Sequence, residues 1–123
     1  MENKLEIGGQ TIFGMESGGN STDGYWIKYA DGRLICYGKT PPMNSGTLTL
    51  YSGMYYGVIE CEYNFPMAFI SVPIVSTTIH SDNLTVCDGL YVLSTKIRHI
   101  GILTPQSSVD NVYVDYIAIG RWK

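Results

Sequence analysis

Two glutamates in the middle of the chain, Glu60 and Glu62, are its clearest candidates for acid–base chemistry. They alternate with Ile59, Cys61 and Tyr63, which is the period of a β-strand, so both carboxylates are expected about 7 Å apart on one face. That separation is within reach of the paired carboxylates of glycosidases. The alternative is a solvated strand face or an inter-subunit contact with Lys or Arg. We favour the alternative, because nothing in the sequence places a sugar between the two carboxylates.

A second short motif, Gly38–Thr40, has the Gly-Lys-Thr of a phosphate-binding loop but lacks the rest of it. Such a loop needs a further glycine at position 33, where this chain has Arg33. It also needs a helix whose N-terminus faces the phosphate, and the two prolines at positions 41 and 42 offer none. We therefore do not expect nucleotide binding.

The histidines and cysteines do not form a recognisable metal or catalytic motif. His80 and His99 are far apart in the sequence, so we expect exposed or hydrogen-bonded strand residues, although one His beside a threefold axis could supply three ligands to a metal. Cys36, Cys61 and Cys87 are odd in number and widely spaced, which favours reduced, buried thiols. Serine nucleophile elbows and HExxH pairs are absent. We expect no enzyme activity, no cofactor and no metal.

Tyrosine is the residue type that stands out, with ten tyrosines and two tryptophans among 123 residues. A tyrosine ring stacks on the C–H face of a sugar while its hydroxyl forms hydrogen bonds, so the residue suits surfaces that bind polar ligands. Several lie at predicted strand ends beside Gly-containing turns, where binding loops sit on a rigid scaffold. The alternative is that they line the core or a subunit interface. The predicted ligand-binding residues are Tyr51, Tyr55, Tyr56, Asp82, Asn83, Asp88 and Tyr91.

A β-hairpin is the element most strongly indicated. Residues 24–30 and 33–38 are two runs rich in aromatic and aliphatic residues, and Asp31-Gly32 lies between them. Asp-Gly between such runs is a strong hairpin signal, because tight hairpin turns need positive φ, which Gly adopts without penalty.

The remaining pattern also predicts strands and no capped helix. Residues 16–24 and 39–46 are expected to be loops, the first because it is rich in Gly, Ser and Asn and the second because its prolines cannot join a central strand. A second hairpin is expected around Asp88-Gly89, and the strand at 112–119 is expected to be buried on both faces. The chain is therefore predicted to be all-β: a small antiparallel β-sandwich of about eight short strands.

Three segments resemble the signature of C-terminal head domains of phage and prophage tail fibre proteins. Gly24–Gly38, GYWIKYADGRLICYG, is similar to a family segment close to GYYIKFADGTLICYG. Phe65–Val75 resembles the family's middle segment, an FP step and a Pro-containing strand, and Tyr116–Lys123 resembles its WIAIGRWK ending. The match spans about residues 16 to 123. Two departures, Arg33 for a common Thr and Tyr116 for a common Trp, could alter what an exposed surface binds.

The resemblance implies a lectin-like head domain that assembles as a homotrimer on an upstream fibre shaft. It implies a protein of the virion tail, made in the bacterial cytoplasm, that recognises a bacterial cell-surface or cell-wall polysaccharide at the host surface. Three weak sites on one rigid tip would gain strength through effective concentration, with no bond-making chemistry. Residues 1–22 are then an N-terminal segment and linker to the shaft, and residues 23–123 the head.

Composition agrees with this interpretation. Charged residues are 15% of the chain, hydrophobic residues 45%, and the net charge is −3. With so few charges, we expect some apolar surface to be buried between subunits. The net charge argues against nucleic-acid binding, and the sequence has neither an apolar run of 18 residues nor a signal-peptide core.

Three functions therefore compete. A receptor-binding head predicts exposed tyrosines at loop tips. A structural module that caps or trimerises a fibre, with no receptor of its own, predicts tyrosines buried between subunits. An enzyme that depolymerises surface glycan predicts a cleft with paired carboxylates.

Overall fold

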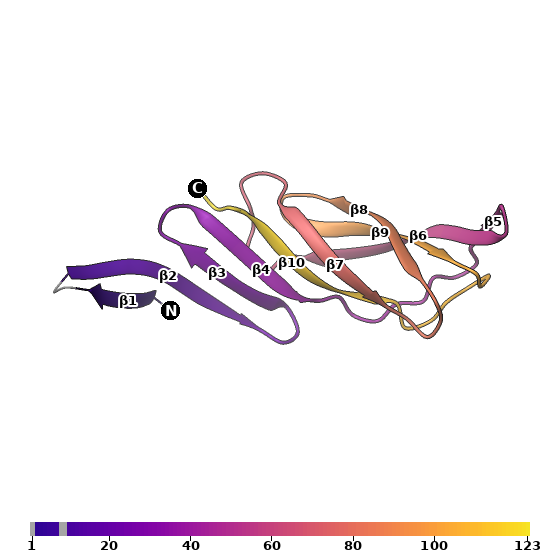
Figure 1. Ribbon diagram of the computed structural model, residues 1–123, viewed down its shortest axis with the longest axis horizontal. Helices are drawn as coiled ribbons and strands as arrows, with labels where there is room; N and C mark the ends of the chain where they lie inside the picture. Colours follow the sequence, from indigo (N-terminus) through magenta and orange to yellow (C-terminus); the bar gives the residue numbers. More distant parts are fainter. Residues whose placement is uncertain (1, 8–9) are drawn as a thin grey trace.

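The computed structural model describes the backbone of residues 2–7 and 10–123 and the side chains of residues 14–123. Within those residues the chain forms ten β-strands and no helix, so no helix is present that could cross a membrane. The molecule is elongated, with the β1–β2 hairpin at one end and β5 at the other (Figure 1). The predicted all-β, antiparallel class is confirmed, with ten strands in place of about eight.

The larger sheet has six antiparallel strands in the order β1-β2-β3-β4-β10-β7. Its strands are β1 (Glu2–Ile7), β2 (Gln10–Asn20), β3 (Gly24–Tyr29), β4 (Arg33–Lys39), β7 (Ile74–His80) and β10 (Tyr113–Arg121). The smaller sheet has four antiparallel strands in the order β5-β6-β9-β8. Its strands are β5 (Thr49–Tyr51), β6 (Met54–Asn64), β8 (Val86–Val92) and β9 (Lys96–Thr104).

The predicted hairpin at the Asp31-Gly32 step is confirmed as β3–β4. Gly32 has a φ of 104°, a conformation that glycine adopts without steric penalty. The Asp31 carboxylate accepts the Arg33 backbone N–H at 3.0 Å, which closes the turn. This hydrogen bond is the main reason that the pKa of Asp31 is lowered.

The loop expected at residues 16–24 is wrong, because β2 continues to Asn20 and pairs with β3. Its glycines serve packing: a Cβ on Gly18 would lie 2.8 Å from the Trp26 ring on the neighbouring strand. The turn comes only after Asn20, whose side-chain oxygen accepts the backbone N–H groups of Thr22 and Asp23 at 2.9 and 2.7 Å.

The hairpin expected at Asp88-Gly89 is also wrong. β8 runs straight through this step, with an irregularity in its pairing to β9 between Cys87 and Gly89. The chain reverses later, where the Leu93 N–H donates to the Lys96 carbonyl at 2.9 Å. The pairing leaves Asp88 without a partner on β9, as the extra residue of a bulge in the strand.

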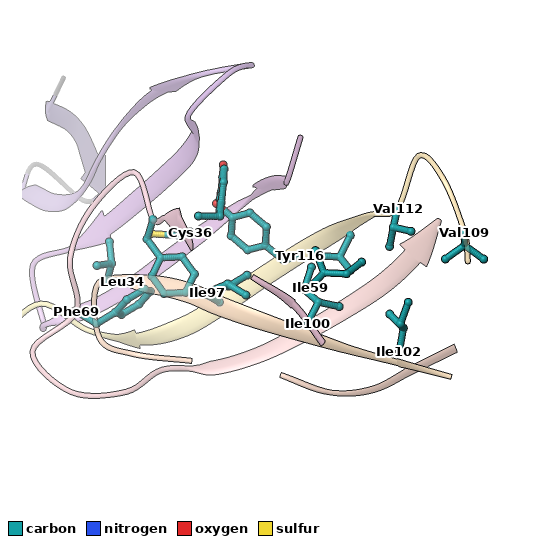
Figure 2. Close-up of a cluster of buried hydrophobic side chains, with 14 of the residues drawn as sticks. Leu34, Cys36, Ile59, Phe69, Ile97, Ile100, Ile102, Val109, Val112 and Tyr116 are labelled. Atoms are coloured by element: carbon teal, nitrogen blue, oxygen red, sulfur yellow. The ribbon is translucent and has the colours of Figure 1, made fainter. Parts of the chain in front are cut away.

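The core lies between the two sheets (Figure 2). Fully buried aliphatic residues come from both: Leu34 and Val114 from the larger sheet, and Ile97, Ile100 and Ile102 from β9. β10 was expected to be buried on both faces, but its residues alternate between buried and exposed, because the smaller sheet covers only its inner face.

Two tyrosines form a polar pair inside this core. The Tyr63 hydroxyl donates to the Asp23 carbonyl at 2.8 Å, and the Tyr116 hydroxyl donates to that of Tyr63 at 3.4 Å. Burial raises the pKa of both phenols, because it disfavours the charged form. Tyr116 was noted as a departure that could alter an exposed surface; it is instead part of the core.

The three segments of the sequence signature meet at one place. The Trp122 backbone N–H donates to the Gly32 carbonyl at 2.9 Å, and its indole N–H donates to the Tyr29 carbonyl at 2.7 Å. The Ile70 N–H donates to the Arg121 carbonyl at 3.0 Å. The last residues of the chain therefore fasten the first hairpin to the middle segment, which explains why these segments form a fold signature.

Candidate functional site

The outer face of the smaller sheet carries most of the predicted ligand-binding residues. We call it the tyrosine face. Strand pairing arranges it in three cross-strand rows about 7 Å apart. Its members, row by row, are Tyr56, Leu103 and Val86; Val58, Gly101 and Gly89; and Glu60, His99 and Tyr91. Asp88 is the extra residue of the irregularity beside Gly89.

The tip of the β5–β6 hairpin extends this face at one end. Tyr51 is 71% exposed, and its ring meets that of Tyr56 edge-on, with centroids 6.4 Å apart. Ser52 and Gly53 both have positive φ, which makes the reversal short and holds the two rings together. The pair offers an aromatic surface at the end of the molecule where β5 lies (Figure 1).

The centre of the face is low because it is built on glycine. A Cβ on Gly101 would lie 2.5 Å from the Asp88 carboxylate, so that carboxylate lies directly above the Gly101 backbone. Asp88 itself is exposed. An acceptor is thus presented between the Tyr56 row and the Tyr91 row, where it can reach hydroxyl groups of a ligand that spans both rows.

The other end of the face combines aromatic and ionic groups. The rings of Tyr91 and His99 are 5.5 Å apart, and the His99 Nε2 lies 3.7 Å from a Glu60 oxygen. Arg98 lies over the Tyr91 ring, 5.9 Å from its centroid. Tyr91 is therefore exposed but supported from two sides.

Glu62 is engaged within its own chain. Its two oxygens accept hydrogen bonds from Lys96 Nζ at 2.8 Å and from Arg98 Nε at 3.1 Å. The Lys96 hydrogen bond is the main reason that the pKa of Glu62 is lowered. The expectation for the glutamate pair was a solvated strand face or an inter-subunit contact with Lys or Arg; the ion pairs of Glu62 with Lys96 and Arg98 lie within the chain.

The remaining predicted residues are placed apart from these rows. Tyr55 packs against the core from the inner side of β6, so the structure separates it from Tyr56. Asp82 accepts two hydrogen bonds from the Asn111 side chain, at 3.0 and 3.1 Å. Asn83 follows in the same loop, which is tied to the end of β9 where the buried Thr104 hydroxyl donates to the Leu84 carbonyl at 2.6 Å.

The outer face of the larger sheet is a second exposed surface, which sequence reasoning missed. We call it the isoleucine face. Register places Ile74, Ile119, Ile35 and Ile27 in one row across four strands, and Ile117, Tyr37 and Tyr25 in the adjacent row. Ile74 is 79% exposed, and Ile117 and Ile119 are exposed as well. Each strand shows the alternation by itself, but only the pairing order brings the isoleucines together.

Polar residues border the isoleucine face at one end. His80 Nε2 lies 2.7 Å from an Asp115 oxygen, and the His80 ring stacks on Tyr113 with centroids 4.7 Å apart. The expectation of a hydrogen-bonded strand histidine is confirmed for His80. In the Gly-Lys-Thr motif, Thr40 is buried and accepts the Val114 N–H at 3.0 Å, which is a structural role.

The cysteines are free thiols. Cys36 is fully buried, and burial raises its pKa to about 11. Cys61 and Cys87 are half-buried.

The chain is an all-β sandwich domain. Its two antiparallel sheets enclose one core, and its tyrosine face and isoleucine face are open to solvent.

No protein-family model matches the chain, and no curated protein matches it. Solved tail fibre structures share its fold. A C-terminal fragment of the Pseudomonas aeruginosa R1 pyocin fibre aligns with a TM-score of 0.58 at 17% identity, over 87% of this chain. An N-truncated R1-type pyocin tail fibre aligns with a TM-score of 0.57 at 17% identity, over 87% of both chains.

This chain spans 28% of the length of the first fibre fragment. At this level of identity the similarity concerns the fold. The resemblance to tail fibre C-terminal domains, which three sequence motifs indicated, is confirmed at that level.

Proposed function

We propose that this chain is a tail fibre head domain of a phage or prophage, assembled as a homotrimer on an upstream shaft, that binds a bacterial surface polysaccharide without cleaving it. The observation that carries the proposal is the fold shared with tail fibre fragments, combined with two outer faces of different composition, the tyrosine face and the isoleucine face. The protein would act in the virion tail after synthesis in the bacterial cytoplasm.

The isoleucine face supports self-assembly. Its two central rows contain isoleucine, tyrosine and serine and no charged residue, whereas the corresponding rows of the tyrosine face contain Asp88, Glu60 and His99. Contiguous apolar surface of this kind marks interaction sites. A second copy of the chain is the partner that a fibre always supplies, and the low overall charge agrees with burial of this surface.

The tyrosine face supports glycan binding. Tyr56 on β6 and Tyr91 on β8 are about 13 Å apart along the direction of β9 and about 10 Å apart across it, hence about 16 Å from each other. The Asp88 carboxylate lies over Gly101, in the row between them. Aromatic rings that stack on sugar rings, with a carboxylate to accept hydroxyl hydrogen bonds, suit an extended saccharide of a few units. Such a site is shallow, and three copies would compensate through multivalency.

The test is adhesion of the fluorescently labelled domain to a panel of bacterial strains, with competition by their purified polysaccharides. Tyr91→Ala and Tyr56→Ala should each reduce adhesion at least about tenfold through lost stacking, while Tyr91→Phe should keep most of it. Polysaccharide incubated with the domain should keep its length, with wild type and with Glu60→Gln alike. Wild-type adhesion by both alanine variants would refute the assignment of this face.

A structural trimerisation or capping role is the second candidate, because the isoleucine face by itself would satisfy it. It predicts that the assembled domain adheres to no bacterial surface and that the alanine variants on the tyrosine face change nothing.

A further inference from the structure

A pocket of about 190 Å³ lies at the corner where the end of the chain crosses the first hairpin, away from both outer faces described above. We call it the corner pocket. Five of its seven lining residues belong to the sequence signature, which the proposed function otherwise uses only for folding, and Met15 and Glu16 come from β2. The residues that matter for its chemistry are Met15, Glu16, Lys28, Tyr29, Trp122 and Lys123.

The indole of Trp122 is a fixed wall of the corner pocket. Its ring N–H donates to the Tyr29 carbonyl at 2.7 Å, and its backbone N–H donates to the Gly32 carbonyl at 2.9 Å. Two hydrogen bonds to one hairpin leave the ring little freedom to turn. The pocket therefore presents a preorganised aromatic surface, which lowers the entropic cost of binding.

Cations surround this ring. Lys28 Nζ lies 4.2 Å from the centroid of the Trp122 ring, and Lys123 Nζ lies 4.8 Å from it. Arg33 lies over the Tyr29 ring at 4.5 Å, and Arg121 donates to the Lys123 carbonyl at 3.1 Å. A chain with a net charge of −3 thus gathers four cationic side chains at this corner.

Two carboxylates at this corner pair with two of these four cations, Asp31 with Arg33 and Glu16 with Lys28. Asp31 is held by Arg33 at 2.8 Å, outside the pocket lining. Glu16 lies 3.8 Å from Lys28 Nζ, which is longer than a hydrogen bond, so this contact leaves the ammonium donors available to a ligand. The pocket therefore offers ammonium donors, one carboxylate acceptor and an aromatic wall within a space of single-ring size.

We propose that the corner pocket binds one carboxylated sugar unit, such as a uronic acid. Lys28 would leave the Trp122 ring to pair with the sugar carboxylate, and Glu16 would accept a hydroxyl hydrogen bond. The ring surface that Lys28 vacates would contact the C–H face of the sugar. The inference rests on the proposed recognition of a bacterial polysaccharide, and it narrows the receptor to an acidic one. The corner pocket would then be a second subsite, distant from the tip of β5 (Figure 1).

The experiment is a titration of the ¹⁵N-labelled chain with sodium D-glucuronate, D-glucose and sodium acetate at equal ionic strength. The chain has two tryptophans, so the Trp122 indole signal is identified by its persistence in Trp26→Phe. Glucuronate should shift that signal in a saturable manner across the millimolar range. Glucose and acetate should each require at least about tenfold higher concentration, because each lacks one of the two recognition elements.

The variants sharpen this result. Lys28→Gln should weaken glucuronate binding at least about tenfold through loss of a charged hydrogen bond, and Lys28→Arg should restore most of it. Glu16→Gln should tighten binding a few-fold, because a competing negative charge is removed while a hydrogen-bonding side chain stays. Lys39→Gln is the matched control, since Lys39 also lies over an aromatic ring, 5.9 Å from the centroid of Tyr113, and lines a separate pocket.

Several outcomes would overturn the inference. Equal affinity for glucose would remove the role of charge, and equal affinity for acetate would mean that any carboxylate, including that of another protein, fits the pocket. Equal loss in Lys39→Gln and Lys28→Gln would show nonspecific attraction. If glucuronate binds but the domain adheres to no bacterium, the proposed function fails and the pocket stands. If the domain adheres through the tyrosine face and glucuronate does not bind, only this inference fails.

Discussion

Replacement of Ile74 by Asp should dissociate the proposed homotrimer without unfolding the chain. Ile74 begins β7, the edge strand of the larger sheet, and is 79% exposed in the single chain. Complete burial of an isoleucine stabilises by about 1.5–3 kcal/mol, so covering the exposed 79% is worth about 1.2–2.4 kcal/mol per copy. Three copies give about 4–7 kcal/mol, which raises the dissociation constant of a trimer by about 10³- to 10⁵-fold.

The folded state should tolerate the change. A substitution at an exposed edge position changes the β-propensity of the residue and few packing contacts. β-Propensities of different residues differ by about 1 kcal/mol at most. Leu84→Asp is the matched control, because Leu84 is 75% exposed but lies in the loop before β8, outside the isoleucine face. The assay is light scattering across a range of protein concentrations, with thermal unfolding followed by circular dichroism.

The expected result is a trimer for wild type and Leu84→Asp, and a folded monomer for Ile74→Asp at the same concentration. A wild-type monomer at every concentration would refute self-assembly through this face. Equal dissociation in both variants would show that exposed apolar residues contribute without regard to their location. A trimer that survives Ile74→Asp would require a different interface.

Three further predictions concern single side chains. Glu62→Gln should lower the melting temperature at pH 7, with the difference vanishing in acid: its pKa is lowered by its lysine partner, so its stabilisation is present above the ordinary pKa of 4.5 and is lost as the pH falls through the lowered value. Tyr116→Phe should cost about 0.5–1.5 kcal/mol at pH 7 through the lost hydrogen bond to Tyr63. This deficit should shrink and then reverse as the pH rises above about 10, because the raised pKa of Tyr116 means that its phenol ionises more readily in the unfolded chain than in the fold. Cys36 should react with iodoacetamide at pH 8 more slowly than the other two thiols, as mass spectrometry can show, because it is buried and its pKa is about 11; fast labelling of Cys36 in the native state would contradict its placement in the core.

The β3–β4 hairpin shows what local sequence can predict. Its turn depends on Gly32 at positive φ and on the Asp31 side chain, and both requirements lie within four residues of chain. The same local rule failed at Asp88-Gly89, because the partner that accommodates this step is Gly101 on the next strand. Because Gly101 has no side chain, there is room for the Asp88 carboxylate, and the residues next to Asp88 in the sequence do not indicate this room.

Composition also gave a wrong prediction for the end of β2. Gly, Ser and Asn predicted a loop, but Gly18 is a strand residue whose missing side chain admits the Trp26 ring. A glycine placed for packing and a glycine placed for a turn are identical in sequence. Only the neighbour across the strand distinguishes them.

By itself the sequence determined the all-β class, the first hairpin and the tail fibre resemblance, because these depend on residue alternation, turn chemistry and short motifs. The tertiary structure decided which residues share a surface. Strand order placed Ile27, Ile35, Ile119 and Ile74 in one row, and it put Tyr56 on the outer side of β6 while turning Tyr55 inward. It also brought Trp122 onto the first hairpin to form the corner pocket. Cross-strand neighbours are set by pairing between distant segments, and each segment's own pattern is compatible with many pairings.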